Sequence, residues 1–260
     1  LFALYLSRDN WSFPVELAAR TVTFVVPLLL LAVDLYIPFF MSFESQASGI
    51  GASVTRPGVD FAGTRPVWAF LFWGPLFVVV VPYVGTRLLA ARERITRRAV
   101  LGASMLPAAV ILGWVALFLW QQAVDSPKLA GAGGLATQIG DRGGEWLTAL
   151  AFAAVLGGSV LALWLEATAP KDERGRQNHV FVLTLASTAF LLVLGCEFFY
   201  VGDLFNSRMN TVFKLYYQAW LLLALNLVVK LNYEEKLLAA RFADYADYQQ
   251  TSKRLIPFIY

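Results

Sequence analysis

The sequence predicts an all-α fold, a polytopic transmembrane bundle of about six spans followed by a C-terminal cytoplasmic amphipathic helix. Of its 260 residues, 58% are hydrophobic and 15% are charged, which is too apolar for a soluble domain of this size. Runs of about 20 apolar residues, the length that crosses a hydrocarbon core, recur along the chain. We expect spans near residues 21–41, 67–88, 99–120, 145–166, 179–200 and 211–231. Residues 1–231 then form the transmembrane domain and residues 232–260 a cytoplasmic interfacial tail.

The segments between the spans differ in composition from one side of the bundle to the other. Residues 42–66 and 121–144 are rich in Gly, Ser and Pro, which predicts loops with short interfacial helices. Their glycines form no nucleotide-binding fingerprint, because no strand precedes them. Within the fourth span, Gly157 and Gly158 are expected to permit close helix packing.

The basic residues predict the orientation of the bundle. Arginines concentrate in the second connection, and Lys and Arg recur in the fourth; the residues are Arg87, Arg92, Arg94, Arg97, Arg98, Lys171, Arg174 and Arg176. With the two ends of the chain, this side holds 15 of the 21 basic residues. Because Lys and Arg accumulate on the cytoplasmic side, both termini are predicted cytoplasmic, in the cytoplasmic (inner) membrane. The net charge of +3 follows from this asymmetry and requires no nucleic-acid partner.

Two further features concern the chain as a whole. It opens LFALYLSRDNWSFP, without an initiator Met and without the pattern of a signal peptide, so we expect it to be the middle of a longer protein. The single cysteine, Cys196, excludes an internal disulfide and is expected to pack as a small hydrophobic residue.

Four charged residues lie between and inside the last two spans: Glu197, Asp203, Arg208 and Lys214. Charge at that depth in lipid costs kilocalories unless it is paired or hydrated, so it indicates a site near the outer membrane face. Arg208 and Lys214 are candidates to bind a lipid-linked phosphate, and Glu197 or Asp203 to act as a catalytic base or to hold a divalent metal. The alternative is an ion-paired structural cluster that closes the outer end of two helices.

A polar stripe continues into the last span. Asn210, Lys214 and Gln218 fall at i, i+4 and i+8 and therefore share one helix face, which requires a partner helix or a water-filled cavity. In the first span, Asp34 is a candidate ion or proton site, with an interhelical hydrogen bond as the alternative. Tryptophans near the span ends are expected to anchor the bundle at the membrane surface: Trp11, Trp68, Trp146 and Trp220.

Three sequence blocks carry a family resemblance: NWSFP at 10–14, IPFFMSFESQASGI at 37–50 and EFFYVGDLFNSRMNTVFKLYYQAW at 197–220. Over residues 1–228 the chain resembles the C-terminal part of the YYY family of uncharacterised multi-spanning membrane proteins. That family is grouped with membrane glycosyltransferases that use polyprenyl-phosphate sugars, which implies a fold of that kind and a polyprenyl-phosphate carrier. On this interpretation Glu197 and Asp203 are catalytic, and the substrate-binding residues are Arg208, Asn210, Lys214, Tyr217 and Gln218.

The chain departs from these enzymes in two respects. Glycosyltransferases of that fold keep their catalytic acidic residues in the first outer loop, upstream of anything present here. In the front block, Ser12 follows Trp11 where the family pattern has an acidic residue.

The tail has a different resemblance. The segment EEKLLAARFADYADYQQTSKRLIPFIY at 234–260 is similar to the C-terminus of isoprenylcysteine carboxyl methyltransferases. This implies that Glu234 and Glu235 contribute to an S-adenosylmethionine site. Those enzymes also need a His-Pro motif, whereas His179 is followed by Val180, so the half-site is incomplete. An interfacial helix is the alternative, with an apolar face formed by Leu237, Leu238, Phe242 and Tyr245.

Three function classes therefore remain, and whether the chain is an enzyme stays open. The first is a glycosyltransferase-like protein with an outer polar pocket for a lipid-linked phosphate. The second is a membrane methyltransferase that uses S-adenosylmethionine. The third is a non-catalytic subunit whose partners are membrane lipids and other membrane subunits.

Overall fold

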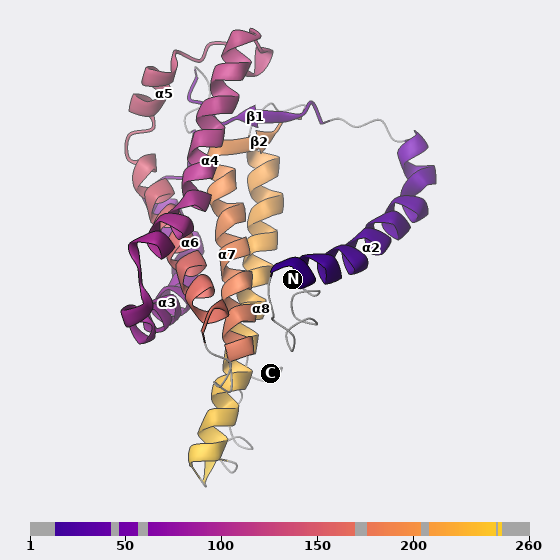
Figure 1. Cartoon of the computed structure of the whole chain (residues 1–260). Helices are drawn as coiled ribbons and strands as arrows, with labels where there is room; N and C mark the ends of the chain where they lie inside the picture. Colours follow the sequence, from indigo (N-terminus) through magenta and orange to yellow (C-terminus); the bar gives the residue numbers. More distant parts are fainter. Residues whose placement is uncertain are drawn as a thin grey trace.

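The computed structural model describes residues 14–42, 47–56, 62–169, 176–203, 208–242 and 244–245. Long helices make up most of it, and they form one bundle with a further helix, α2, set apart from it (Figure 1). The predicted all-α polytopic bundle is therefore confirmed. In chain order the elements are α2 (Pro14–Ser42), β1 (Ile50–Ala52), α3 (Pro66–Ala90), η2 (Arg92–Arg94), α4 (Arg97–Ala123), η3 (Pro127–Leu129), α5 (Leu135–Asp141), α6 (Glu145–Ala167), α7 (Arg176–Phe198), β2 (Phe199–Val201) and α8 (Met209–Arg241).

Five helices in the described part of the chain are long and apolar enough to cross a membrane: Pro66–Ala90, Arg97–Ala123, Glu145–Ala167, His179–Phe198 and Met209–Val229. They correspond to the second through sixth predicted spans. The first predicted span falls within the 29-residue helix α2, whose fully described side chains include the apolar segment Val25–Ile37. The described residues thus contain five candidate spans in the bundle and a further apolar segment in α2, outside it.

The last two spans differ from their predicted limits. The fifth ends at Phe198 instead of residue 200, because residues 199–201 leave the helix and pair antiparallel with β1, placing Tyr200 opposite Gly51. The sixth continues as helix to Arg241, since the segment after residue 231 is rich in the helix formers Glu, Lys, Leu and Ala. The predicted boundary between domain and tail therefore lies inside one continuous helix, and residues 246–260 fall outside the described part.

Helix α7 occupies the centre of the bundle. It packs against α6 on one side, α8 on the other, and also α4. A helix that is apolar all round is suited to such a position, and side chains along α7 are fully buried: Leu183, Ala186, Ala189, Phe190, Val193 and Leu194.

The paired glycines of α6 lie beside two neighbouring helices. A Cβ added at Gly157 would lie 3.8 Å from Pro107 Cγ of α4, and one at Gly158 would lie 3.7 Å from Val84 Cγ1 of α3. Both values are ordinary van der Waals distances, so a methyl group would also fit at either position. Pro107 itself lies inside a helix, as membrane helices tolerate when neighbouring helices support the backbone.

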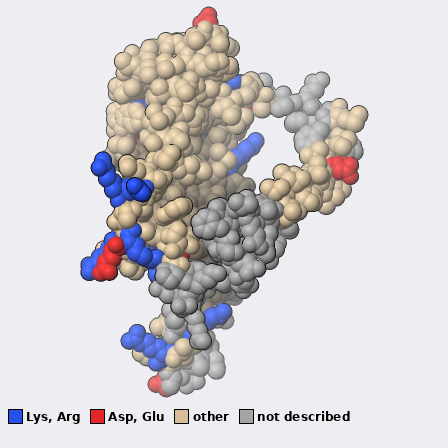
Figure 2. Space-filling view, in the orientation of Figure 1, with Lys and Arg blue, Asp and Glu red and all other residues tan. Residues whose placement is uncertain are grey.

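The two ends of the bundle differ in their secondary structure and in their charge. The sheet end holds β1, β2, η3 and α5 (Figure 1). The basic end holds η2 and the start of α4, with Arg92, Arg94, Arg97 and Arg98 exposed, and Figure 2 shows Lys and Arg side chains gathering over this part of the molecule. The arginine-rich connection thus lies at one end of the bundle and the glycine-rich loops at the other.

Helix α2 stands away from the bundle (Figure 1). Its described apolar side chains are widely exposed, including Leu30 at 65% and Leu35 at 69%. Asp34 is also exposed on this helix.

Candidate functional site

The charged cluster centres on Glu197, a fully buried residue in the last turn of α7. Its Oε2 accepts a hydrogen bond from Thr64 N at 2.6 Å, and its Oε1 accepts from Thr64 Oγ1 at 2.7 Å and from the Tyr216 hydroxyl at 2.9 Å. Arg208 forms an ion pair with the same carboxylate at 3.5 Å. A buried carboxylate needs such partners, because desolvation of an unpaired charge costs several kilocalories.

A second carboxylate lies on the other side of the same loop. Glu145, the first residue of α6, is buried and accepts a hydrogen bond from Gly63 N at 2.6 Å. Two carboxylates from different helices therefore bind consecutive backbone amides, those of Gly63 and Thr64. A Cβ at Gly63 would lie 3.0 Å from Oε2 of both Glu145 and Glu197, so only glycine fits between them without movement.

Arg142 completes the cluster from the turn before α6. It is 1% exposed, and its guanidinium lies over the rings of Trp114, Phe198 and Trp146 at 4.8, 4.8 and 5.6 Å from the centroids. It donates hydrogen bonds to the carbonyl oxygens of Glu197 at 3.1 Å and of Ser53 at 3.0 Å. The guanidinium thereby joins the end of α7 to the segment after β1.

Burial lowers the pKa of Arg142 to about 10, while Glu197 and Glu145 act to raise it. The side chain therefore remains cationic at neutral pH. With Arg208 it balances the charges of the two carboxylates. Four buried or half-buried charges from three parts of the chain thus balance one another, and we call them the sheet-end cluster: Arg142, Glu145, Glu197 and Arg208.

Of the residues predicted from sequence, the structure joins Glu197 and Arg208 in this cluster. The Arg208 guanidinium also donates to Cys196 O at 2.8 Å and to Thr64 Oγ1 at 2.6 Å. Cys196 is fully buried, as expected of a small hydrophobic residue.

The other predicted residues lie outside the cluster. Asp203 accepts a hydrogen bond from Asn210 Nδ2 near the start of α8. Lys214 is exposed one turn further along α8 and has no hydrogen bond or ion pair with a described residue. Tyr217 and Gln218 are exposed on the following turn. The residues therefore separate into a buried cluster and an exposed stripe on α8.

At the far end of α8, Glu234 and Glu235 lie within the helix, and the Glu235 carboxylate accepts a hydrogen bond from the Tyr245 hydroxyl at 2.9 Å. Among the residues that the structure describes, no group of three or more His, Cys, Asp or Glu side chains is placed to hold a metal ion.

Two members of the sheet-end cluster, Arg142 and Glu145, were not predicted from the sequence, and neither were Thr64 and Tyr216, which donate hydrogen bonds to Glu197. Arg142 and Glu145 flank two glycines at the start of a span, in the sequence DRGGEW. A charged residue beside an apolar run, the pattern that identified Glu197, could also have identified Arg142 and Glu145. Trp146, predicted as a surface anchor, is half-buried at the start of α6, where its ring lies against the Arg142 guanidinium.

The basic end has a charged cluster of its own, formed by side chains of α3, α6 and α7. The Arg87 guanidinium forms an ion pair with Glu166 at 2.8 Å and donates to His179 Nε2 at 3.2 Å. The other ring nitrogen, Nδ1, lies 2.9 Å from the Tyr83 hydroxyl. Because Arg87 has only N–H donors, Nε2 of His179 is the acceptor in this contact.

Comparison with curated proteins and with solved structures gave no match. A family model described as an uncharacterised membrane protein, DUF2298, matches residues 6–223, which include five of the long helices and the whole sheet-end cluster. The chain belongs to this family of uncharacterised membrane proteins.

Proposed function

We propose that the chain is the membrane-spanning part of a glycosyltransferase-like protein that binds a polyprenyl-phosphate carrier, with the carrier's phosphate at Lys214. The observation that supports this best is the exposure of Lys214 in an apolar span, without a partner among the described residues. A cation in that position is costly in lipid unless an anion accompanies it.

The depth of Lys214 suits a phosphate at the membrane surface. It follows Met209, the first residue of α8, by five positions, which at 1.5 Å per residue is about 7.5 Å along the helix. A lysine stem is long enough to bring its ammonium to the level of lipid phosphates. Asn210 and Gln218, on the same face, add amide donors for phosphate oxygens.

Apolar surface for a prenyl chain lies beside this polar stripe. Phe213 is 74% exposed, Tyr217 is 64% exposed and Leu221 is 54% exposed on the same helix. A lipid whose phosphate lies at Lys214 would have its first isoprene units against these side chains. By contrast, Arg208 is engaged by Glu197, Thr64 and Cys196, so we assign it to the support of the site and not to direct phosphate binding.

A second candidate function is that of a non-catalytic subunit in a larger membrane complex. The exposure of α2, with Leu30 and Leu35 uncovered by other described helices, favours it. In that case a partner helix would cover the polar stripe of α8.

The test is binding of a short polyprenyl phosphate to the purified protein in nanodiscs, measured by native mass spectrometry. Lys214→Ala is expected to weaken binding by about 1.5 to 3 kcal/mol, which is roughly tenfold to a hundredfold, because a charge-assisted hydrogen bond is lost. Lys236→Ala is the matched control, since Lys236 is an exposed lysine near the other end of the same helix. Unchanged binding in Lys214→Ala would reject the phosphate site and leave the subunit function.

We also infer that the protein lies in an inner membrane. Its sheet end would then face the outside of the cell, and its basic end would face the cytoplasm. Single cysteines at Glu93 and Thr137, both exposed, test this with a membrane-impermeant thiol reagent. The natural Cys196 is fully buried and gives little background. We expect Thr137→Cys to react in intact cells and Glu93→Cys only after lysis; the opposite pattern would invert the orientation.

A further inference from the structure

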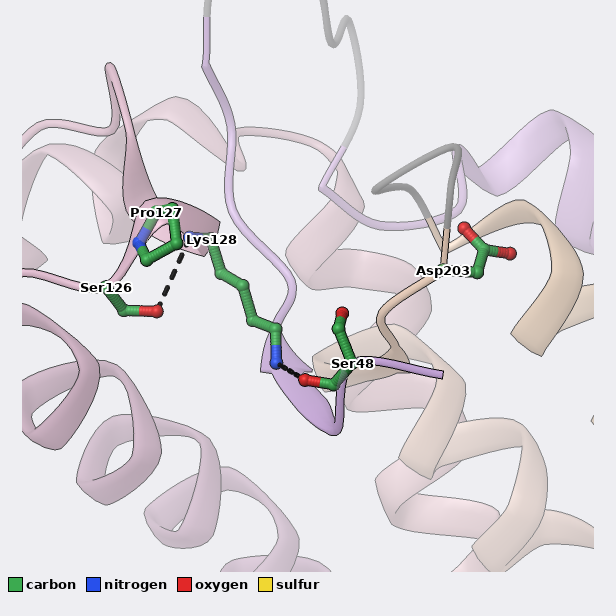
Figure 3. Close-up of a pocket in the computed structure, with 5 residues that line it drawn as sticks. All are labelled: Ser48, Ser126, Pro127, Lys128 and Asp203. Carbon is green, nitrogen blue, oxygen red and sulfur yellow. Dashed lines mark hydrogen bonds between the residues drawn. The ribbon is translucent and has the colours of Figure 1, made fainter. Parts of the chain in front are cut away.

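The loops of the sheet end form a half-open cavity of about 370 Å³, which is separate from the proposed phosphate site. Its walls come from three segments: the residue stretch before β1, the η3 turn, and the exit from β2 (Figure 3). The lining residues are Ser48, Ser126, Pro127, Lys128 and Asp203. The volume is at the lower end of the range of small-molecule sites, about 300 to 1,000 Å³.

The lining combines one cation, one anion and two hydroxyl groups. The Lys128 ammonium donates to the carbonyl oxygen of Ser48, which leaves donor capacity for a ligand (Figure 3). Asp203 supplies carboxylate oxygens, which accept hydrogen bonds from hydroxyl groups. An anionic ligand would be repelled by Asp203 and a cationic one by Lys128. A neutral ligand with many hydroxyl groups satisfies both.

Backbone contacts fix two of these walls relative to each other. Ser48 N donates to Gly202 O at 2.8 Å, and Gly202 N donates to Gly49 O at 2.8 Å. A Cβ at Gly202 would press against Ser48 Oγ and would lie 3.1 Å from Lys128 Cε. Because Gly202 has no side chain, the segments that carry Ser48 and Lys128 can approach each other at this edge of the cavity.

A hydrogen bond links this cavity to the stripe on α8. Asn210 donates from Nδ2 to Asp203, which lines the cavity. Lys214 lies four residues after Asn210 on the same helix face, about 6 Å along the axis. Polar groups thus continue from the cavity to the position proposed for the phosphate.

From these contacts we propose that the cavity binds the sugar of a lipid-linked monosaccharide whose phosphate lies at Lys214. This inference rests on the proposed function. Asp203 accepts hydrogen bonds from sugar hydroxyls, and Lys128 donates to sugar oxygens. Neither residue contacts the prenyl chain or the phosphate.

The experiment compares two probes in nanodiscs, a short polyprenyl phosphate and the same lipid carrying one hexose. Asp203→Asn keeps the shape of the side chain and an acceptor for Asn210, and Lys128→Met keeps the stem. We expect each variant to weaken binding of the glycosylated probe about tenfold, the loss of one hydrogen bond to a charged group, and to leave the plain probe unchanged. Asp125→Asn is the control, because Asp125 is an exposed neighbour of Ser126 outside the lining.

The outcomes separate the two proposals. If Lys214→Ala weakens both probes but Asp203→Asn and Lys128→Met weaken neither, the sugar site is wrong and the phosphate site stands. If Lys214→Ala weakens neither probe, the proposed function fails. Equal loss of both probes in Asp203→Asn would overturn the sugar assignment. Binding of a free methyl hexoside as tightly as the glycosylated lipid would overturn the lipid-linked source.

Discussion

At the sheet end, Glu145 and Glu197 accept hydrogen bonds from the backbone of a loop, whereas at the basic end Glu166 pairs with the side chain of Arg87. Backbone amides cannot move away without unfolding the loop, so the first arrangement fixes the chain between two helices. A side-chain partner can rotate. Buried glutamates therefore hold a loop in place at the sheet end, whereas at the basic end a buried glutamate connects two helices.

Solvent access also differs between the two clusters. The side chains of Glu197 and Arg208 are 0% and 16% exposed, and those of Glu166 and Arg87 are 3% and 23% exposed. If Arg87 loses its partner, its guanidinium has more access to water. If Arg208 loses Glu197, its charge is harder to hydrate. Arg142, which is 1% exposed, is a second buried cation in the same cluster. This difference predicts unequal costs for equivalent substitutions.

The largest expected effect is that of Glu197→Ala. It removes the acceptor of Thr64 and Tyr216 and leaves the charge of Arg208 unpaired, so we expect a loss of about 3 to 5 kcal/mol in the free energy of unfolding. For Glu166→Ala we expect about 1.5 to 2 kcal/mol, the lower end of the usual range for a lost hydrogen bond to a charged group. Reversible unfolding in mixed micelles measures both. Equal losses of unfolding free energy in the two variants would show that the two glutamates contribute equally to stability.

A smaller effect is expected where the loop passes between the carboxylates. Gly63→Ala places a methyl group 3.0 Å from Oε2 of Glu145 and of Glu197, so one carboxylate must shift from its backbone amide. We expect a loss of about 1 to 3 kcal/mol in the same assay, as for other overpacked sites. Gly140→Ala in α5 is the control, because no atom lies within 4 Å of its added Cβ and alanine favours helix. If the two variants are equally stable, the loop is not held as tightly as we describe.

The spans could be predicted because hydrophobicity is a local property of the sequence. Helix α6 begins at Glu145 and ends at Ala167, within one residue of its predicted limits. The end of α7 could not be placed in this way, because it depends on pairing between Tyr200 and Gly51, about 150 positions apart in the chain. Strand pairing over that distance leaves no periodic signal in three residues.

The charged residues of the candidate site could be predicted from the sequence, but the contacts between them and the loop could not. Glu197 and Arg208 stood out as charge beside apolar runs, and the structure pairs them. The loop residue Thr64 has no such signal, since a threonine before a proline-initiated helix is ordinary. Its contact with Glu197 spans 133 positions, so only the packing of α3 against the rest of the bundle brings the two together.

Two glutamine side chains attach the segment around β1 to the helices. The Gln121 amide accepts from Ala52 N at 3.2 Å and donates to Ile50 O at 2.9 Å. The Gln138 amide bonds both main-chain groups of Thr55, at 2.7 and 2.9 Å. These amides recognise only the peptide backbone. We therefore expect substitution of an outward-facing residue of this segment, such as Ile50, to leave its attachment intact, and substitution of either glutamine to release it.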